Sequence, residues 1–220
     1  MDYNQMSLHA AAANQSCLKA ESSAQLGRVE TSAADCSQTM GCAVAETKSD
    51  SYGDDFAKAG GGVFVLNMDG TGIRIWFWSR NDVPGSIKTA NRTTNVDFDL
   101  STWGTPSAAY LATSGCDARQ AIVPQHIVFD ISLCGSWAGS PEVYNNTCPT
   151  KGSCVVDNVI GPGNPVYNDA YFEINYLRAY FLTNATIPAG VSGVSGSSKL
   201  SRWIFGAHVT IFSLYFVMRP

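Results

Sequence analysis

The sequence predicts an all-β fold, a sandwich of antiparallel strands. Short apolar runs alternate with clusters of Gly and Pro, one pair of runs is joined by a tight Asp-Gly turn, and no helical pattern of convincing length precedes the tail. The 220 residues are 45% hydrophobic and 15% charged, which is typical of one globular domain with a tail and excludes a disordered chain.

The first half of the chain is expected to hold one short strand, one long loop and a hairpin. The strand lies near residues 5–9, and the segment 7–60 lacks a sustained apolar stripe, so most of it is expected to be a loop held by two or three cysteines. A Gly-rich turn then opens an apolar run at 63–68, and an Asp-Gly-Thr-Gly turn leads into a strand at 73–80. Together these two runs predict a β-hairpin.

The side chains of the second hairpin strand alternate between two faces. One face carries Arg74, Trp76 and Trp78, and the other carries Ile73, Ile75 and Phe77. Such a strand suits a sandwich in which one face packs on the core while the other offers aromatic rings to a ligand. Two further strands are expected at 126–133 and 170–181.

The C-terminal part of the chain differs from the rest. Residues 183–202 are small and polar and predict a flexible linker between a domain at 1–182 and a hydrophobic tail at 203–220. The sixteen residues 203–218 are nearly all apolar but short for a membrane span, which needs about 20. The pattern matches a glycolipid-anchor signal that would attach the protein to a membrane. The alternative is a terminal segment that is buried or misassigned to the chain.

Charge and cysteine content bound the class of protein. The net charge is −4 and no basic run is visible, which excludes a nucleic-acid partner and favours a neutral substrate. The seven cysteines show neither a C-x-x-C pair nor His partners at zinc spacing, so disulfides are expected and metal sites are not. The odd count leaves two alternatives, a partner cysteine upstream of residue 1 or one free thiol.

Glycosylation acceptors of the N-x-[ST] type agree with the cysteines on a protein of the secretory pathway. They are Asn14, Asn91, Asn145 and Asn184, each in a polar, turn-rich stretch. The first six residues contain neither a basic nor an apolar region, so the chain shows no signal peptide and its natural N-terminus is expected upstream.

Four aromatic-rich blocks occur in a fixed order, and together they resemble one family. They are Ile-Trp-Phe-Trp-Ser-Arg at 75–80, Ser-Thr-Trp-Gly-Thr-Pro at 101–106, Leu-Cys-Gly-Ser-Trp-Ala-Gly at 133–139 and Ala-Tyr-Phe-Glu-Ile at 170–174. The chain resembles the fungal secreted endo-1,3(4)-β-glucanases of glycoside hydrolase family 16 from about residue 4 to residue 181. The resemblance implies a concanavalin-like jelly-roll β-sandwich with a concave sugar-binding face, here truncated at its N-terminus by several strands.

The same resemblance exposes an absence of catalytic residues. Members of the family carry an E-x-D-x-x-E strand, whose first Glu is the nucleophile and whose last Glu is the acid/base of a retaining mechanism. No such motif occurs in this chain, and the segment that follows it in the family matches residues 4–9. Asp97 and Asp99 have same-face spacing, but a role as turn or cap residues is favoured for them. Glu142 and Glu173 stand alone.

For sugar binding, the resemblance implies residues beside the cleft. They are His9, Trp78, Arg80, Trp103 and Trp137. A sugar ring stacks its apolar C–H face on an aromatic ring, yet buried Trp is common, so packing is an equal alternative for Trp78 and Trp103 and the favoured one for Trp137. The family residue that matches His9 lies beside the catalytic strand, where it donates to substrate or acid/base.

The resulting hypothesis is a fragment of a secreted retaining endo-1,3(4)-β-glucanase whose Glu pair lies upstream of Met1. Its partner would be a β-1,3- or mixed-linkage glucan, outside the cell or at its surface, with no cofactor and no metal. This chain alone would hydrolyse nothing. The alternative is a catalytically silent β-glucan-binding or cell-wall-associated protein.

Overall fold

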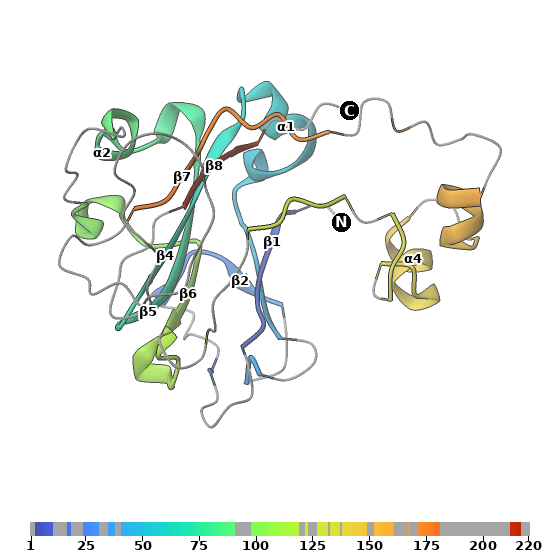
Figure 1. Ribbon diagram of the computed structural model, residues 1–220, viewed down its shortest axis with the longest axis horizontal. Coiled ribbons are helices and arrows are strands. Elements are labelled where there is room, and N and C mark those ends of the chain that lie inside the picture. The colour runs from blue at the N-terminus through green and yellow to red at the C-terminus, as the bar shows by residue number, and fades with distance from the viewer. Residues whose placement is uncertain are drawn as a thin grey trace, which may run out of the picture.

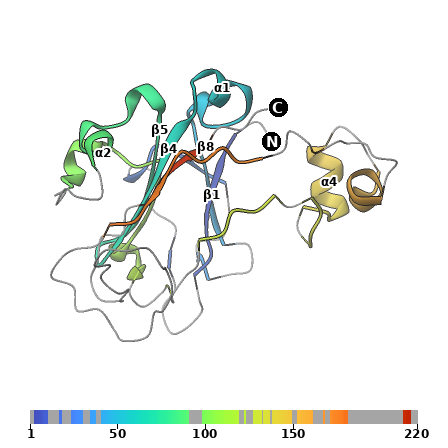
Figure 2. The ribbon, with the colours of Figure 1, turned by 45° about the horizontal axis from the view of Figure 1, so that its top comes forward.

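The computed structural model describes most of residues 3–180 and one strand of the tail. The described residues are 3–10, 17–18, 24–30, 35–37, 41–90, 98–118, 122, 127–131, 133–136, 138–148, 152–160, 167, 171–180 and 212–216. They form two antiparallel sheets that face one another and a small lobe that stands to one side of them (Figures 1 and 2).

The smaller sheet has three strands in the order β1-β3-β2. Strand β1 is Gln5–Leu8, β2 is Arg28–Val29 and β3 is Cys42–Ala45. The first strand is therefore confirmed, whereas the prediction of one long loop after it was wrong. The missed strands are only two and four residues long, and their pairing is set by contacts with distant parts of the chain, which local patterns do not reveal.

The larger sheet has five strands in the order β6-β5-β4-β8-β7. Their bounds are β4 Gly62–Asp69, β5 Gly72–Ser79, β6 Ala108–Leu111, β7 Leu177–Arg178 and β8 Phe212–Phe216. The predicted hairpin is confirmed as β4 and β5, which pair over their full length. At its turn the Asp69 carboxylate accepts from the Thr71 amide at 2.7 Å, and Gly72 follows with φ of 138°, a value that favours glycine.

The two other predicted strands were largely wrong. Of the segment 170–181 only β7 is a strand within the described residues, and 127–131 belongs to no named strand. A strand is stabilised by the ladder that it forms with a neighbouring strand, and 127–131 takes part in none of the ladders between the described strands. Ile127 and Val128 accordingly remain 43% and 76% exposed.

The helices are short, as predicted. Helix α1 is Gly53–Lys58, α2 is Gly85–Thr89 and α4 is Pro141–Thr147, while single turns form η2 at Ser49–Ser51, η3 at Arg80–Asp82, η4 at Leu100–Trp103 and η5 at Ala112–Ser114. A π-helical turn, η6, spans Val156–Ile160. Among the described residues, no helix has both the length and the apolar character needed to cross a membrane.

The core lies between the two sheets. Met6 and Val44 from the small sheet pack against Ile73, Ala108 and Tyr110 from the large one. Tyr110 is 1% exposed, and its hydroxyl donates to the Cys42 carbonyl at 3.1 Å, which ties the sheets together at their centre. Burial of the phenol raises the pKa of Tyr110, so the hydroxyl remains a donor throughout the ordinary pH range.

A second tie between the sheets is the crossing at Gly27. The Gly27 amide donates to the Ser107 carbonyl at 2.9 Å just before its chain enters β2. A Cβ atom on Gly27 would lie 2.4 Å from Cγ1 of Val44 and 2.5 Å from the Ser107 oxygen. Only glycine fits this approach, because Val44 in β3 and Ser107, which directly precedes β6, are both buried.

Three disulfides confirm the prediction from the cysteine content. Cys17 bonds Cys116, Cys36 bonds Cys42, and Cys134 bonds Cys154. Cys148 stands outside these three bonds. The Cys17–Cys116 bond lies in the core between the sheets, and the Cys134–Cys154 bond joins the two parts of the lobe that carries α4 and η6.

The two disulfides of the sandwich are expected to differ in their effect on stability. Loss of Cys17–Cys116, which closes a loop of 99 residues, should lower the free energy of unfolding by about 4–5 kcal/mol. Loss of Cys36–Cys42, which closes a loop of 6 residues, should cost about 2 kcal/mol. Urea unfolding of the two double Cys→Ala variants measures both. Equal losses would show that closure of the long loop is not what stabilises the sandwich.

Candidate functional site

The predicted sugar-binding residues fall into separate parts of the structure. Trp78 and Trp103 are packed on the outer face of the large sheet, where they are 7% and 4% exposed. The ring of Trp103 stands edge-on against Trp78 at 5.7 Å and against Trp76 at 5.3 Å. The packing alternative thus describes these rings, because helix α2, turn η4 and the tyrosines around β7 cover this face.

The indole N–H groups of this Trp cluster are satisfied inside the protein. Trp76 Nε1 donates to the Gly104 carbonyl at 3.1 Å, and Trp103 Nε1 donates to the Ser86 hydroxyl at 3.2 Å. A platform for sugars would leave one ring face in solvent. Both faces of β5 are covered in this structure, and the expectation that the second hairpin strand offers aromatic rings to a ligand stays a prediction.

Arg80 and Trp137 lie elsewhere. Arg80 is half-buried in turn η3, and its Nε donates to the Gly60 carbonyl in the turn between α1 and β4. Trp137 lies outside the described residues, as do the acceptors Asn14, Asn91 and Asn184. Asn145 lies in helix α4 and is half-buried, with its Oδ1 atom enclosed, so the expectation of a polar turn at this acceptor was wrong.

His9 is the predicted residue that stands on an open surface. It is exposed immediately after β1, and its ring lies against Gly41, whose φ is 60° at the start of β3. A Cβ atom on Gly41 would approach the ring Nδ1 to 2.8 Å. The tight turn at Gly41 therefore leaves room for the imidazole.

His9 belongs to the outer face of the small sheet. In the register, Met6 opposes Val44 on the core side, so Gln5 and Ser7 point outward opposite Ala45 and Ala43. Continuing the alternation puts His9 on the same side. On the second edge, Arg28 opposes Ala45, and the Glu30 amide donates to the Ala43 carbonyl at 2.9 Å.

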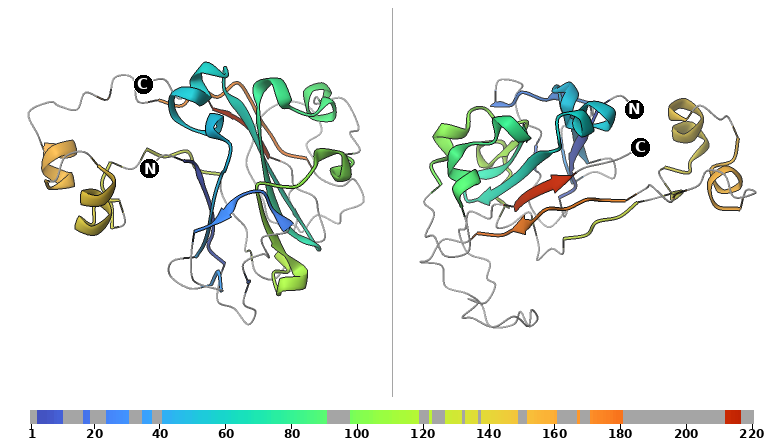
Figure 3. Two further views of the ribbon diagram at one scale, coloured as in Figure 1. Left: turned by 180° about the vertical axis from the view of Figure 1, so that it is seen from behind. Right: turned by 90° about the horizontal axis from the view of Figure 1, so that it is seen from above.

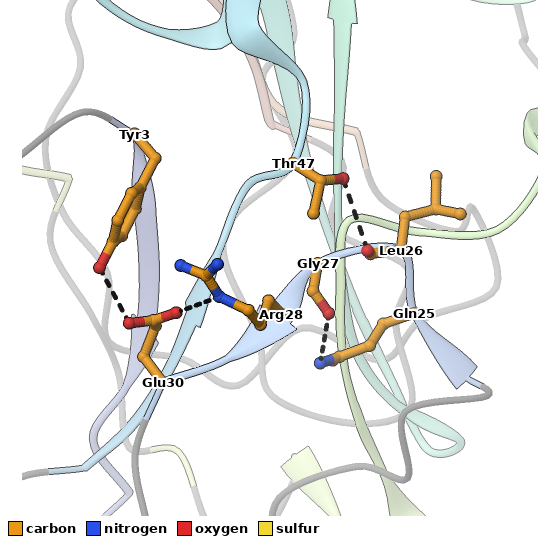
Figure 4. Close-up of polar contacts among 7 residues, drawn as sticks. All are labelled: Tyr3, Gln25, Leu26, Gly27, Arg28, Glu30 and Thr47. Carbon is orange, nitrogen blue, oxygen red and sulfur yellow. Dashed lines mark hydrogen bonds and ion pairs between the residues drawn. The ribbon is translucent and has the colours of Figure 1, made fainter.

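This outer face has a floor of small residues and a polar surround. Ala43 and Ala45 are 7% and 2% exposed, and longer polar side chains stand around them. At one end, the Tyr3 hydroxyl donates to Glu30 Oε2 at 2.8 Å and Arg28 Nε donates to Glu30 Oε1 at 2.7 Å (Figure 4). The guanidinium carbon of Arg28 lies 5.4 Å from the centre of the Tyr3 ring.

The charges of this trio support one another. The hydrogen bond from Arg28, followed by that from Tyr3, lowers the pKa of the Glu30 carboxyl. The hydrogen bond that Tyr3 donates to Glu30 raises the pKa of the Tyr3 phenol. At neutral pH the face therefore presents a carboxylate, a guanidinium and a phenol as fixed donors and acceptors, and His9 follows the far end of β1.

The described residues supply one further test of the catalytic expectation. Asp99 is the N-cap of η4, where its Oδ1 accepts from the Ser101 amide at 3.0 Å, so the predicted cap role is confirmed. Asp97 lies outside the described residues. In the described part of the chain no group of three His, Cys, Asp or Glu side chains is arranged to hold a metal ion.

Comparison with known proteins decides the family. A family model for the XgeA-like catalytic GH16 domain matches residues 1–180. The chain belongs to glycoside hydrolase family 16. It is 36% identical over 144 residues to a probable glycosidase of Schizosaccharomyces pombe, covering 66% of this chain and 32% of the relative. It is 35% identical over 170 residues to a probable endo-1,3(4)-beta-glucanase of Neosartorya fischeri, covering 74% of this chain and 24% of the relative.

Solved structures of this family share the fold. An elongating GH family 16 beta-1,3-glucosyltransferase superposes with a TM-score of 0.56 at 31% identity, covering 70% of this chain and 49% of that one. Laminarinase 16A of Phanerochaete chrysosporium, solved with beta-glucans in donor and acceptor sites, gives 0.55 at 29% identity, covering 72% and 52%. The likeness confirms the expected jelly-roll sandwich, and the chain spans about half of each solved GH16 domain.

Sequence reasoning missed the trio on the small sheet. Arg28 and Glu30 lie two residues apart, which places them on one face of a strand, but the strand itself is too short to be recognised. The polar alternation of Gln5, Ser7 and His9 was the available signal for an open face.

Replacing Trp103 separates packing from sugar binding. Trp103→Ala should lower the free energy of unfolding by about 3–5 kcal/mol, because it opens a cavity in the cluster, and Trp103→Phe should cost less. Urea unfolding measures both. Retention of Trp103→Phe on insoluble β-1,3-glucan should match that of the parent chain. If Trp103→Ala kept full stability but lost glucan binding, Trp103 would be a sugar-binding residue and not a packing residue.

The Glu30 carboxyl should titrate below an ordinary glutamate. Its lowered pKa means that the stability it contributes is present above the unfolded-state value of about 4.3 and is lost as the pH falls through the folded-state value. Arg28→Gln should raise the midpoint more than Tyr3→Phe, because the Arg28 bond is the larger cause. Carboxyl NMR titration measures each midpoint, and an unchanged value in Arg28→Gln would contradict the network.

Proposed function

We propose that this chain is the C-terminal part of a retaining endo-1,3(4)-β-glucanase domain, whose two catalytic carboxyl groups come from a strand preceding residue 4. The observation that carries the proposal is the edge position of β1. In the described part of the chain β1 pairs with β3 on one side and has no strand partner on the other. A strand added there would extend the small sheet beside His9.

An added strand would have the geometry that the reaction needs. Neighbouring strands lie about 4.8 Å apart, so outward side chains of the new strand would stand next to Gln5, Ser7 and His9. Two carboxyl groups about 5–5.5 Å apart perform retaining hydrolysis, one as nucleophile and the other as acid and then base. His9 would lie within reach of the acid/base or of a substrate hydroxyl, which supports a positioning role for it.

The rest of the outer face, from β1 across β3 to β2, would bind the glucan. Strand β2 lies two strand spacings from β1, about 10 Å. Between them, Ala43 and Ala45 form a floor without long side chains, and Arg28 with Glu30 offers donors and an acceptor for hydroxyl groups. Trp78 and Trp103 would support this sheet from the opposite side of the sandwich by packing.

The descriptions of two solved relatives indicate which reactions should be assayed. One solved relative is described as a glucosyltransferase and another as a laminarinase. In a retaining mechanism both outcomes share the covalent glycosyl-enzyme, which forms as the aglycone leaves and is then attacked by water or by a sugar hydroxyl. The assay must therefore record transfer products as well as reducing ends.

Passage through the secretory pathway, with the mature protein outside the cell or at its surface, is part of the same proposal. Three disulfides support it, since such bonds persist in oxidising compartments. A protein outside the cell or at its surface would meet neutral β-glucan in the cell wall.

The deciding experiment extends the chain. The 5′ end of the transcript is sequenced, and the protein with its upstream residues is secreted from a yeast host and incubated with laminarin. We expect shortened or elongated oligosaccharides from the extended protein and none from residues 1–220. Replacing the first Glu of the added motif by Gln should abolish turnover, while His9→Ala should reduce kcat at least tenfold with little change in unfolding midpoint.

Two outcomes would contradict the proposal. If the transcript encodes no carboxylate pair upstream, or if the extended protein leaves laminarin unchanged, the chain is no glucanase part. Retention of residues 1–220 on insoluble β-1,3-glucan without product would then favour the silent glucan-binding alternative. The matched variant is Lys58→Ala, whose exposed charge lies on α1 and should alter neither binding nor turnover.

A further inference from the structure

One strand of the large sheet comes from outside the family domain. The family match ends at residue 180, whereas β8 spans Phe212–Phe216. Nevertheless β8 lies inside the sheet, between β4 and β7, both of which belong to the matched part (Figure 3). A segment outside the family match therefore occupies an interior position of the sheet.

The edge of β4 that β8 covers would otherwise be a long unpaired strand edge. Strand β4 is eight residues long, and without β8 one of its two edges would be unpaired over Gly62–Leu66. Val63 and Val65 in this stretch are fully buried. A long flat edge above a buried apolar face is a template for aggregation, and proteins cover such edges.

Strand β8 also anchors the cover of the Trp cluster. Strand β7 pairs with β8 at Leu177 and Arg178. On either side of β7, Tyr176 and Tyr180 pack against the cluster, and Arg178 donates to the Ala90 carbonyl. The Tyr180 ring meets Phe98 at 4.9 Å, edge-on. Among the described residues, β8 thus joins β7 to the large sheet through main-chain pairing.

We propose that the apolar tail completes the sheet in cis, as a substitute strand inserted into the slot between β4 and β7. The interaction is β-strand addition: main-chain hydrogen bonds on both sides of β8 supply the affinity. The tail would then be part of the folded domain and would not serve as a membrane or glycolipid attachment. The proposal rests on family membership and pairing, and it holds whether or not the extended protein turns over glucan.

The register makes the proposal testable in the full chain. Leu66 lies directly opposite Phe212, and opposed residues in antiparallel strands have Cα atoms about 4.5–5.5 Å apart, which suits a disulfide. The double variant Leu66→Cys with Phe212→Cys should form this bond, seen by mass spectrometry of a non-reduced digest. The control, Leu66→Cys with Phe216→Cys, should not, because Phe216 lies opposite Gly62, about 13 Å along the strand.

A second measurement uses the backbone. Leu214 lies opposite Phe64 on one side and Leu177 on the other. Leu214→Pro removes an amide and disrupts the middle of β8, so hydrogen exchange of the β4 amides should accelerate at least tenfold, while β6 stays protected. Leu214→Val should leave β4 protected. The proposal is overturned if both cysteine pairs cross-link equally, if β4 exchange is unchanged in Leu214→Pro, or if the intact mass of the mature protein lacks the tail.

Discussion

Strand β5 is buried on both faces, and the arrangement of the other elements follows from this burial. Its Ile73 side chain faces the small sheet and its Phe77 ring lies near Phe56 of α1, while Trp76 and Trp78 face outward under η4 and α2. Two large indole rings on an exposed sheet would leave several hundred Å² of apolar surface in water. The cover of this face is therefore a requirement of the sequence of β5.

The small sheet is left as the open face, and it is held by few contacts. Its strands have four, four and two residues, too few to be stable alone. Tyr110, the crossing at Gly27 and the Cys17–Cys116 bond fasten it to the large sheet. Because these ties approach from the core side, the outer side is free to carry polar groups such as Arg28 and Glu30 without loss of packing.

Sequence patterns predicted what is local and missed what depends on distant partners. The β4–β5 hairpin was predictable, because alternation and an Asp-Gly turn lie in one stretch, and the cap at Asp99 depends on the next two residues. Strands β2 and β3 were missed, since their pairing is with residues far along the chain. The alternation of side chains in β5 correctly predicted its two faces. The local sequence does not indicate which of these faces a distant segment such as η4 will cover.

The strand predicted over 127–131 was wrong for the opposite reason. Its residues suit a strand, yet a strand needs a ladder, and 127–131 takes part in none of the ladders between the described strands. Val128 and Ile131 accordingly remain exposed.

The two sheet edges explain how both proposals can hold together. Strand β1 exposes only four residues of edge, flanked by polar side chains, and so short an edge is tolerated. Strand β4 would expose a longer edge over a buried apolar face, which favours occupation by the nearest apolar segment that can reach it. An upstream strand would therefore meet a vacant edge at β1 and an occupied one at β4. Because the edges belong to different sheets, a strand added beside β1 would not require β8 to leave.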